Sequence, residues 1–221
     1  MFGLNPIRGV VKGSGDTLLV QEIFLTIQGE GPLVGHPAVF VRLGGCNLAC
    51  TFCDTEFEGF TPISINQIFS TILNLTKNAK TKLIVITGGE PMRQPIEKFC
   101  QMLLVNSFNI QIETNGTIFR DLPDKVQIVC SPKPSNGYYY RIREDLLKKL
   151  IAIKFIVSKN NALYSDIAEV GQEDYKIPVY IQPMDEYEEK LNRQNINHAI
   201  SLSQRFGYIL SMQVHKLIDI P

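Results

Sequence analysis

The 221-residue sequence lacks an excess of charge of either sign, because 22 Lys and Arg residues balance 22 Asp and Glu residues. Proteins that bind nucleic acid or anionic membranes usually carry a basic surface, so we predict no direct nucleic-acid partner and no membrane partner. No apolar run reaches the length of a membrane span, and the opening residues MFGLNPIRGVVKGSGD lack the apolar core of a signal peptide. These absences predict a cytoplasmic protein.

Cysteine is scarce as well as unevenly placed. The five cysteines are an odd number, and three of them lie within eight residues, which makes a poor framework for disulfides. The sequence has no internal repeat, no low-complexity tract and no Pro/Gly-rich linker that would divide it. Its composition, 44% hydrophobic and 20% charged, is that of a globular protein. We therefore predict one domain that spans residues 1–221.

Short apolar runs typical of strands alternate with helical patterns along the chain. The predicted strands are 38–43, 83–87, 110–113, 126–130, 153–157, 179–182 and 208–213, with an additional strand or hairpin arm at 17–26. One predicted helix, 64–75, opens with a Ser64/Gln67 capping box, and another covers 96–104. Strands that are buried on both faces and separated by helices indicate a parallel sheet, either open or curled into a barrel.

Gly-rich or polar segments follow most of these strands. They are GGCNLAC after 38–43, GGEP after 83–87, TNG after 110–113, SPK after 126–130, PMD after 179–182 and VHK after 208–213. The carboxyl ends of parallel strands share one rim, which is where α/β folds bind ligands and perform chemistry. We therefore expect one active site, built from several of these loops.

Three of the cysteines, Cys46, Cys50 and Cys53, form a C-x3-C-x2-C motif. Tetrahedral zinc and most iron–sulfur sites have four protein ligands, so this set is one ligand short. One interpretation is a structural zinc site completed by His36 or His215, and another is a group of buried thiols that only pack. Both interpretations stay open on spacing alone.

A third interpretation accounts for the missing ligand. C-x3-C-x2-C is the signature of radical S-adenosylmethionine (SAM) enzymes, in which three thiolates hold a 4Fe–4S cluster and the fourth iron chelates SAM. One electron from the cluster then releases a 5′-deoxyadenosyl radical. The aromatic Phe52 before the last cysteine fits that superfamily. Cys100 and Cys130 lie on an apolar helix face and at the end of a strand, so we expect them to pack in the core.

Other polar residues on the rim have a structural and a functional interpretation. The TGGEP segment at 87–91 is either a tight turn or the SAM-binding turn of radical SAM proteins, where glycine lets the backbone approach a ligand. Lys133 and Asp185 are either solvated loop charges or contacts of the SAM ribose and carboxylate. Arg42 lies in an otherwise apolar strand, so it is either paired or binds a carboxylate.

Taken together, the motifs resemble the 7-carboxy-7-deazaguanine synthase family. They are EIFLTIQGEGPLVGHPAVFVRLGGCNLACTFCDTEF, TGGEP, IETNG, CSPK, IQPMD and SMQVHKLIDIP. The resemblance runs in register from about residue 20 to residue 221, and residues 1–16 are an N-terminal extension outside it. It implies an α/β fold of radical SAM type, an incomplete (βα) barrel of parallel strands with an N-terminal strand or hairpin, and a homodimer.

The resemblance also implies a reaction. Members of the family convert 6-carboxy-5,6,7,8-tetrahydropterin to 7-carboxy-7-deazaguanine by a radical ring contraction with loss of ammonia, on the route to queuosine-type tRNA nucleosides. They are carbon–nitrogen lyases with a 4Fe–4S cluster, SAM that is returned unconsumed, and Mg²⁺ as cofactors. An electron donor, of a flavodoxin-like kind, is expected to reduce the cluster.

Site residues follow from the resemblance by motif. The metal ligands would be Cys46, Cys50 and Cys53 for the cluster and Thr55 for Mg²⁺, a cation that needs few protein oxygens. The SAM-binding residues would be Phe52, Gly89, Glu90, Ser131, Pro132, Lys133, Gln182, Pro183, Met184 and Asp185. The substrate-binding residues would be Ile27, Gln28, Gly29, Glu30, Arg42, Thr87, His215 and Pro221.

The end of the chain carries one further expectation, and two alternative functions stay open. The final segment SMQVHKLIDIP is expected to run strand-like from the core and to bring Pro221 into the pterin pocket. A radical SAM activase that generates a glycyl radical on a partner protein shares the cysteine and GGEP motifs, but it does not account for TIQGEG, Arg42 or the terminal motif. The alternative that is not an enzyme is a zinc-stabilised binding module.

Overall fold

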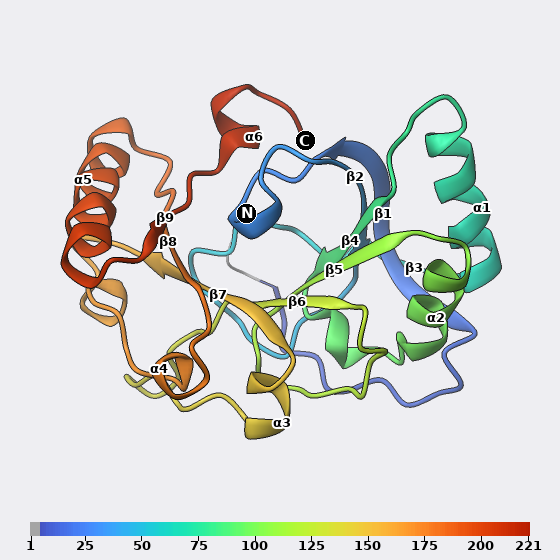
Figure 1. Ribbon diagram of the computed structural model, residues 1–221, viewed down its shortest axis with the longest axis horizontal. Coiled ribbons are helices and arrows are strands. Elements are labelled where there is room, and N and C mark those ends of the chain that lie inside the picture. Colours follow the sequence, from blue (N-terminus) through green and yellow to red (C-terminus); the bar gives the residue numbers. More distant parts are fainter. Residues whose placement is uncertain (1–4) are drawn as a thin grey trace.

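One nine-stranded sheet organises the chain in the computed structural model, which describes residues 5–221 (Figure 1). The strands are β1 Thr17–Ile27, β2 Pro37–Leu43, β3 Thr61–Ser64, β4 Leu83–Gly88, β5 Asn109–Thr114, β6 Gln127–Cys130, β7 Leu150–Val157, β8 Val179–Pro183 and β9 Ile209–Leu210. Their order is β3-β1-β2-β4-β5-β6-β7-β8-β9. Among the described residues β3 and β9 stand at opposite ends of that order, so the sheet is an unclosed barrel.

Strand direction agrees with the sequence prediction. All pairs from β2 to β9 are parallel, while β1 is antiparallel to β2 and β3 is antiparallel to β1. The central strands are apolar on both faces; Ile84, Val85 and Ile86 on β4, for example, are fully buried. The predicted N-terminal arm is β1, which forms a hairpin with β2. Strand β3 was not predicted, because four residues that include a proline give a weak strand signal.

Within residues 5–221, six α-helices and three short 3-10 helices accompany the strands, and all but the last of them lie between strands. They are α1 Ile65–Thr76, α2 Glu97–Val105, α3 Glu144–Leu147, α4 Gln172–Tyr175, α5 Glu189–Phe206 and α6 Val214–Leu217, with η1 Gly31–Leu33, η2 Pro91–Arg93 and η3 Ala162–Tyr164. The predicted capping box of α1 is confirmed: the Ser64 hydroxyl accepts from the Gln67 backbone N–H, and the Gln67 side chain accepts from Ser64 N–H. The prediction of α2 is also confirmed.

Helix α5 was missed in the sequence. Its buried residues are Asn195, Ala199 and Leu202, so the apolar stripe that marks an amphipathic helix is thin. Helices α1 and α2 lie outside the curved sheet near one end, and α5 lies outside it near the other (Figure 1). No described helix is long and apolar enough to cross a membrane.

The prediction for the last segment was wrong in its secondary structure. Strand β9 covers only Ile209–Leu210, and the residues beyond it form α6 rather than a continued strand. The chain leaves the sheet because β9 is an edge strand, and the backbone N–H of Val214 then bonds to the Gly29 carbonyl at 3.0 Å. This contact carries the C-terminal segment across to the β1–β2 hairpin (Figure 1).

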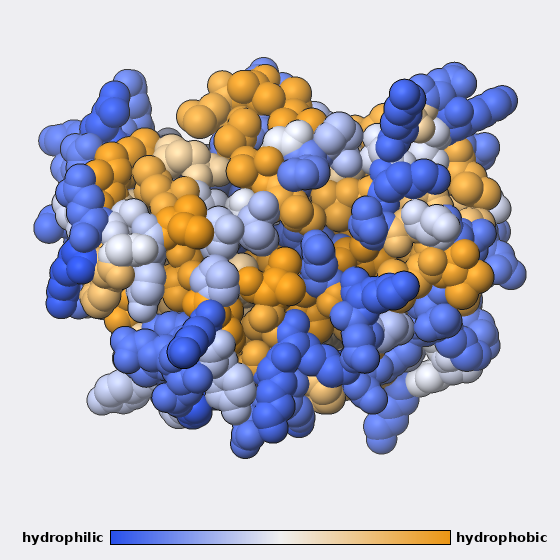
Figure 2. Space-filling model, in the orientation of Figure 1, coloured by the Kyte–Doolittle hydropathy of each residue, from blue (hydrophilic) through white to orange (hydrophobic). Residues whose placement is uncertain are grey.

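The hydrophobic core lies between the sheet and its outer helices. It includes the fully buried Phe99 of α2 and Phe155 of β7. Cys100 and Cys130 are also fully buried there, which confirms that they pack in the core. On the visible face, apolar side chains gather over α6 and beside β9, while hydrophilic side chains dominate the outer side of α5 and the lower edge (Figure 2).

Candidate active site

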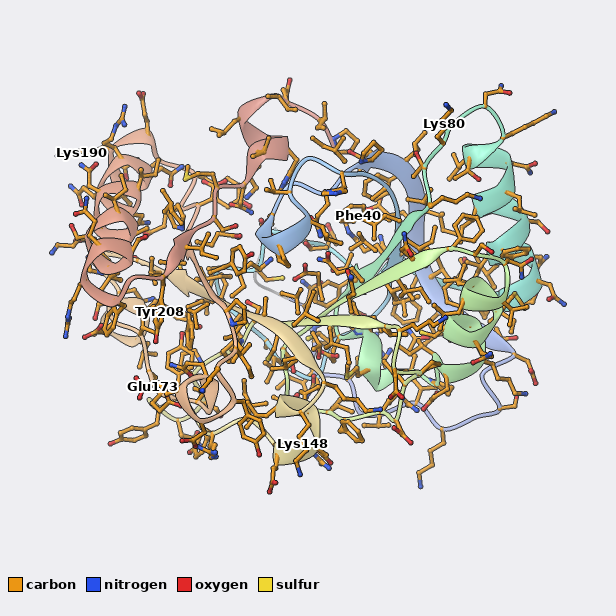
Figure 3. The ribbon with its side chains drawn as sticks, in the orientation of Figure 1. Phe40, Lys80, Lys148, Glu173, Lys190 and Tyr208 are labelled. Carbon is orange, nitrogen blue, oxygen red and sulfur yellow. The ribbon has the colours of Figure 1, made fainter. Side chains whose placement is uncertain are left out.

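The loops at the carboxyl ends of the parallel strands enclose a cavity of about 350 Å³. It is lined by the loop after β2, the turns after β4, β5 and β6, strand β7, and the C-terminal segment. This volume lies within the usual range for small-molecule sites. In Figure 3, Phe40 on the cavity wall lies near the middle of the molecule, whereas Lys80, Lys148, Glu173 and Lys190 point outward at its edge.

The three motif cysteines all line this cavity. They belong to the loop between β2 and β3, residues 44–60, which we call the cysteine loop. Burial raises the pKa of the Cys46 thiol to about 11 and also raises the pKa values of Cys50 and Cys53. Metal ligation requires the thiolate, and a bound metal cluster supplies the positive charge that stabilises it. The donor set therefore fits a metal cluster.

A mononuclear zinc site fits less well. Among residues 5–221, no three His, Cys, Asp or Glu side chains converge on a point that could hold one metal ion. His36 is exposed, lies outside the cavity lining and has its ring nitrogen 3.0 Å from the Leu33 carbonyl oxygen. A zinc ion requires four donors in one shell, whereas the thiolates of a 4Fe–4S cluster each bind a different iron and stand further apart.

The glycine turn after β4 packs directly against the cysteine loop. A Cβ added to Gly89 would collide with the backbone carbonyl of Gly45, so only glycine allows this approach. The next residue, Glu90, is fully buried and accepts hydrogen bonds from Asn115 N–H at 2.7 Å and from the Thr114 hydroxyl at 2.8 Å. Glu90 thus ties the β4 turn to the β5 turn instead of facing the cavity.

The residues that the resemblance assigned to SAM divide into two groups. Those that line the cavity are Phe52, Gly89, Ser131 and Lys133, and those that do not are Glu90, Pro132, Gln182, Pro183, Met184 and Asp185. The Lys133 ammonium donates to the carbonyl and hydroxyl oxygens of Ser131, both at 2.7 Å. Asp185 pairs with Lys216 at 2.9 Å, which joins the loop after β8 to α6.

The residues assigned to the substrate, apart from Gly29, all line the cavity. Ile27, Gln28, Glu30, Arg42, Thr87, His215 and Pro221 line the cavity, as does Thr55. Arg42 forms an ion pair with Glu22 and stacks over the ring of Phe24, so it is paired while it faces the cavity. The Thr26 hydroxyl donates to the Pro221 carbonyl oxygen at 2.7 Å. Pro221 therefore reaches the cavity, although through a helix rather than a strand.

Gly29 does not line the cavity but supports His215. A Cβ added to Gly29 would collide with the imidazole ring of His215, so glycine is required for α6 to pack here. Burial lowers the pKa of His215, and the imidazole is therefore neutral near pH 7. The neutral ring carries one donor and one acceptor nitrogen.

Replacing Gly29 with alanine is expected to displace His215 and lower kcat/KM by about ten- to hundredfold, because a displacement of about 1 Å is enough for a loss of that size. Iron content should stay unchanged, since the cysteine loop is not touched. Gly13→Ala is the matched control, because a Cβ at Gly13 would meet nothing within 4 Å. Equal kcat/KM for Gly29→Ala and the wild type would contradict this role.

A buried ionic network lines part of the cavity and was missed in the sequence, apart from Glu30 and Gln28. The Lys154 ammonium of β7 forms an ion pair with Glu30 and a second one with Glu113 of β5 at 3.2 Å. Three glutamine amides complete the network, from Gln28 and Gln111 to Glu113 and from Gln213 to Glu30.

The charges of this network follow from burial and mutual attraction. Burial alone would raise the pKa of Glu30, but the nearby Lys154 charge outweighs it and holds the pKa at about 2. Burial raises the pKa of Glu113, while the two carboxylates raise the pKa of Lys154. The lysine is therefore charged and holds two carboxylates at the cavity wall. A lysine within the apolar strand IKFIV was the available signal, by the same reasoning that singled out Arg42.

An unclosed, mostly parallel sheet with a three-thiol loop after its first parallel strand and a glycine turn after the next defines a radical SAM enzyme. The radical SAM superfamily matches residues 40–133. The chain is 56% identical to the 7-carboxy-7-deazaguanine synthase of Rickettsia prowazekii, over 100% of this chain and 96% of that protein. It is 35% identical to that of Rhodospirillum rubrum, over 100% of both. The chain belongs to the 7-carboxy-7-deazaguanine synthase family.

A solved structure supports the same assignment. The crystal structure of QueE from Escherichia coli matches with a TM-score of 0.71 at 25% identity, covering 90% of this chain and 95% of that one. The predicted fold class is thereby confirmed. The chain is a radical SAM lyase of deazapurine biosynthesis with a 4Fe–4S cluster and SAM as cofactors. Membership of this family excludes the activase and zinc-module interpretations.

Proposed function

We propose that this chain converts 6-carboxy-5,6,7,8-tetrahydropterin to 7-carboxy-7-deazaguanine with loss of ammonia, on the route to queuosine-type tRNA nucleosides. The observation that carries the proposal is one cavity that is lined both by the three thiols and by the network of Lys154, Glu30 and Glu113. Residues 1–221 would form one radical SAM domain, since a single sheet runs through the described part of the chain.

The thiol side of the cavity would hold the cofactors. Cys46, Cys50 and Cys53 would bind the cluster, and Gly89 would present its backbone to SAM. Bound together, the cluster and SAM would supply the radical chemistry that acts on the pterin. Burial lowers the pKa of Lys133. The Lys133 side-chain nitrogen would donate a hydrogen bond to the SAM carboxylate.

The opposite side would hold the pterin. A pterin carries a guanidine-like edge of N–H donors, and Glu30 and Glu113 are acceptors already desolvated at the cavity wall. Gln28 and the neutral His215 supply further hydrogen bonds at the same wall. The substrate also carries a carboxylate, and the Arg42 guanidinium is suited to bind it. The stacked rings of Phe24 and Phe40, with centroids 5.5 Å apart, give the pocket an apolar wall that excludes water.

The experiment that tests this proposal is an anaerobic incubation of the reconstituted holoenzyme with SAM, a reductant, Mg²⁺ and 6-carboxy-5,6,7,8-tetrahydropterin. Mass spectrometry should detect 7-carboxy-7-deazaguanine, formed over many turnovers. A chain that carries a full cluster and cleaves SAM but forms no deazaguanine would refute the proposed substrate.

Thr55 is the proposed protein ligand of Mg²⁺. Its hydroxyl lies on the cavity wall 3.3 Å from a carboxylate oxygen of Asp54. Thr55→Ser is expected to retain stimulation by Mg²⁺, whereas Thr55→Val should lose most of it, because valine keeps the shape and removes only the hydroxyl oxygen. Initial rates over a Mg²⁺ titration measure this. Indistinguishable titrations of the two variants would place the metal elsewhere.

We also propose two protein partners and a compartment. A flavodoxin-like electron donor would reduce the cluster, and a homodimer would form as the resemblance implies. The exposed Ile209, Leu210, Leu217 and Ile218 offer an apolar surface that supports self-association, which sedimentation velocity of the holoenzyme tests. All five cysteines are free thiols, and this supports the proposal that the protein acts in the reducing environment of the cytoplasm.

A further inference from the structure

Residues 5–11 run along the cysteine loop. Ile7 pairs with Cys46 in an isolated parallel bridge, and the Arg8 backbone N–H donates to the Cys46 carbonyl at 2.7 Å. Asn5 lines the active-site cavity together with the cysteines. The segment therefore contacts the backbone of a cluster ligand and forms part of the site wall.

Two side chains of this segment extend the contact to the far half of the loop. The Arg8 guanidinium forms an ion pair with Glu58, with Nε 2.8 Å from Oε2 and 3.1 Å from Oε1, and lies 5.4 Å from the ring centre of Phe60. The Asn5 amide donates to the Thr55 carbonyl at 3.0 Å. A charge-assisted hydrogen bond of this kind is stronger than one between neutral groups.

The cysteine loop has little regular structure of its own. Apart from the bridge at Cys46, residues 44–60 form no helix or strand. Within the loop, the Gly45 N–H bonds to the Phe57 carbonyl at 3.0 Å and the Cys53 N–H bonds to the Cys50 carbonyl at 3.2 Å, so few backbone hydrogen bonds hold the cysteines in place. Segments with few backbone bonds open at low free energy, so external contacts control how often such a loop opens.

The segment is itself anchored to the body of the protein through Arg93, which is buried. The Arg93 carbonyl accepts from Val11 N–H at 2.8 Å, and its guanidinium donates to the Gly9 carbonyl at 2.8 Å and to the Gly44 carbonyl at 2.9 Å. One buried guanidinium thus joins the N-terminal segment to the start of the cysteine loop.

We propose that residues 5–11 act as a brace for the cluster-binding loop, with Asn5 and Arg8 as positioning residues. Iron is released when the loop opens and the thiolates separate from the cluster. A brace that bonds to Cys46, Thr55 and Glu58 at once lowers the fraction of open loop, so it slows the loss of iron.

The test is the rate of iron release from anaerobic holoenzyme to a ferrous chelator. Arg8→Gln and Glu58→Gln are each expected to accelerate release about two- to fivefold, the range expected for an exposed ion pair. The exchanged pair, Arg8→Glu with Glu58→Arg, should restore most of the wild-type rate. Arg141→Gln is the matched control, because it breaks an exposed pair with Asp174 of 2.6 Å that lies outside the cavity lining.

Two results would overturn the proposal that residues 5–11 act as a brace. One is iron release at the wild-type rate from both single variants. The other is a fall in the melting temperature of the cluster-free chain that accounts for the faster release, since that would indicate general destabilisation. Iron release requires no pterin, so the brace can fail while deazaguanine still forms, and a chain that forms no deazaguanine can still show the brace.

Discussion

Replacing Cys53 with alanine is expected to leave a folded chain that holds no catalytic 4Fe–4S cluster and forms no product. The same result is expected for Cys46→Ala and Cys50→Ala. The remaining two of the five cysteines are fully buried in the core, so neither can supply the lost thiolate. Iron and sulfide content, together with the electron paramagnetic resonance signal of the reduced cluster, measure the effect.

Cys100→Ala is the matched control. It removes a thiol of the same kind from the core and should keep both cluster and activity, while it lowers the free energy of unfolding by roughly 1 kcal/mol. If Cys100→Ala lost the cluster as completely as Cys53→Ala, the assignment of three cluster ligands would be wrong.

Lys154→Met is expected to lower kcat/KM by about a hundredfold and to destabilise the fold by about 3–5 kcal/mol, because it leaves two carboxylates buried without their cation. Lys154 is 5% exposed, so water cannot replace the lost charge. The activity falls because Glu30 and Glu113 lose the group that holds them in place. Steady-state kinetics and denaturant unfolding measure the two effects.

The loss of stability should depend on pH in a definite direction. In the wild type the pKa of Glu30 lies at about 2, below its ordinary value of 4.5, so its ionised form stabilises the fold above that value and the contribution is lost as the pH falls toward 2. Without Lys154, burial raises the pKa instead, and protonation favours the folded state. Lowering the pH from about 8 to about 5 should therefore narrow the difference in stability between variant and wild type.

Lys148→Met is the control for this prediction. Lys148 forms an ion pair with Glu144 at 2.7 Å, but its side chain is 61% exposed, so its loss should change stability by less than about 1 kcal/mol and leave kcat/KM unchanged. Equal effects of Lys154→Met and Lys148→Met would show that the buried network has no special role.

The sequence predicted most of the parallel strands and the placement of the cysteine, glycine and SPK loops on one rim. Those features depend on local patterns: apolar runs of strand length, and glycines and polar residues directly after them. The pairing of Lys154 with Glu30 and Glu113 was missed because it joins strands distant in sequence, and a single polar residue in an apolar run gives no hint of its partner.

The two ends of the described chain were harder to predict for different reasons. The final segment contains alternating apolar residues that read as a strand, yet the edge of the sheet offers one partner, and the contact of Val214 with Gly29 draws it away. The role of Asn5 and Arg8 could not be predicted, because their partners Thr55 and Glu58 lie in a loop without a regular pattern.

The central claim is that one cavity brings a pterin next to the radical-generating cofactors, and the fate of the hydrogen at C6 tests it most directly. Holoenzyme should be incubated anaerobically with SAM, reductant, Mg²⁺ and substrate deuterated at C6, and the recovered SAM analysed by mass spectrometry. The account predicts that deazaguanine forms and that deuterium accumulates in SAM, which is returned unconsumed. Formation of product without deuterium in SAM, or SAM cleavage without product, would contradict it.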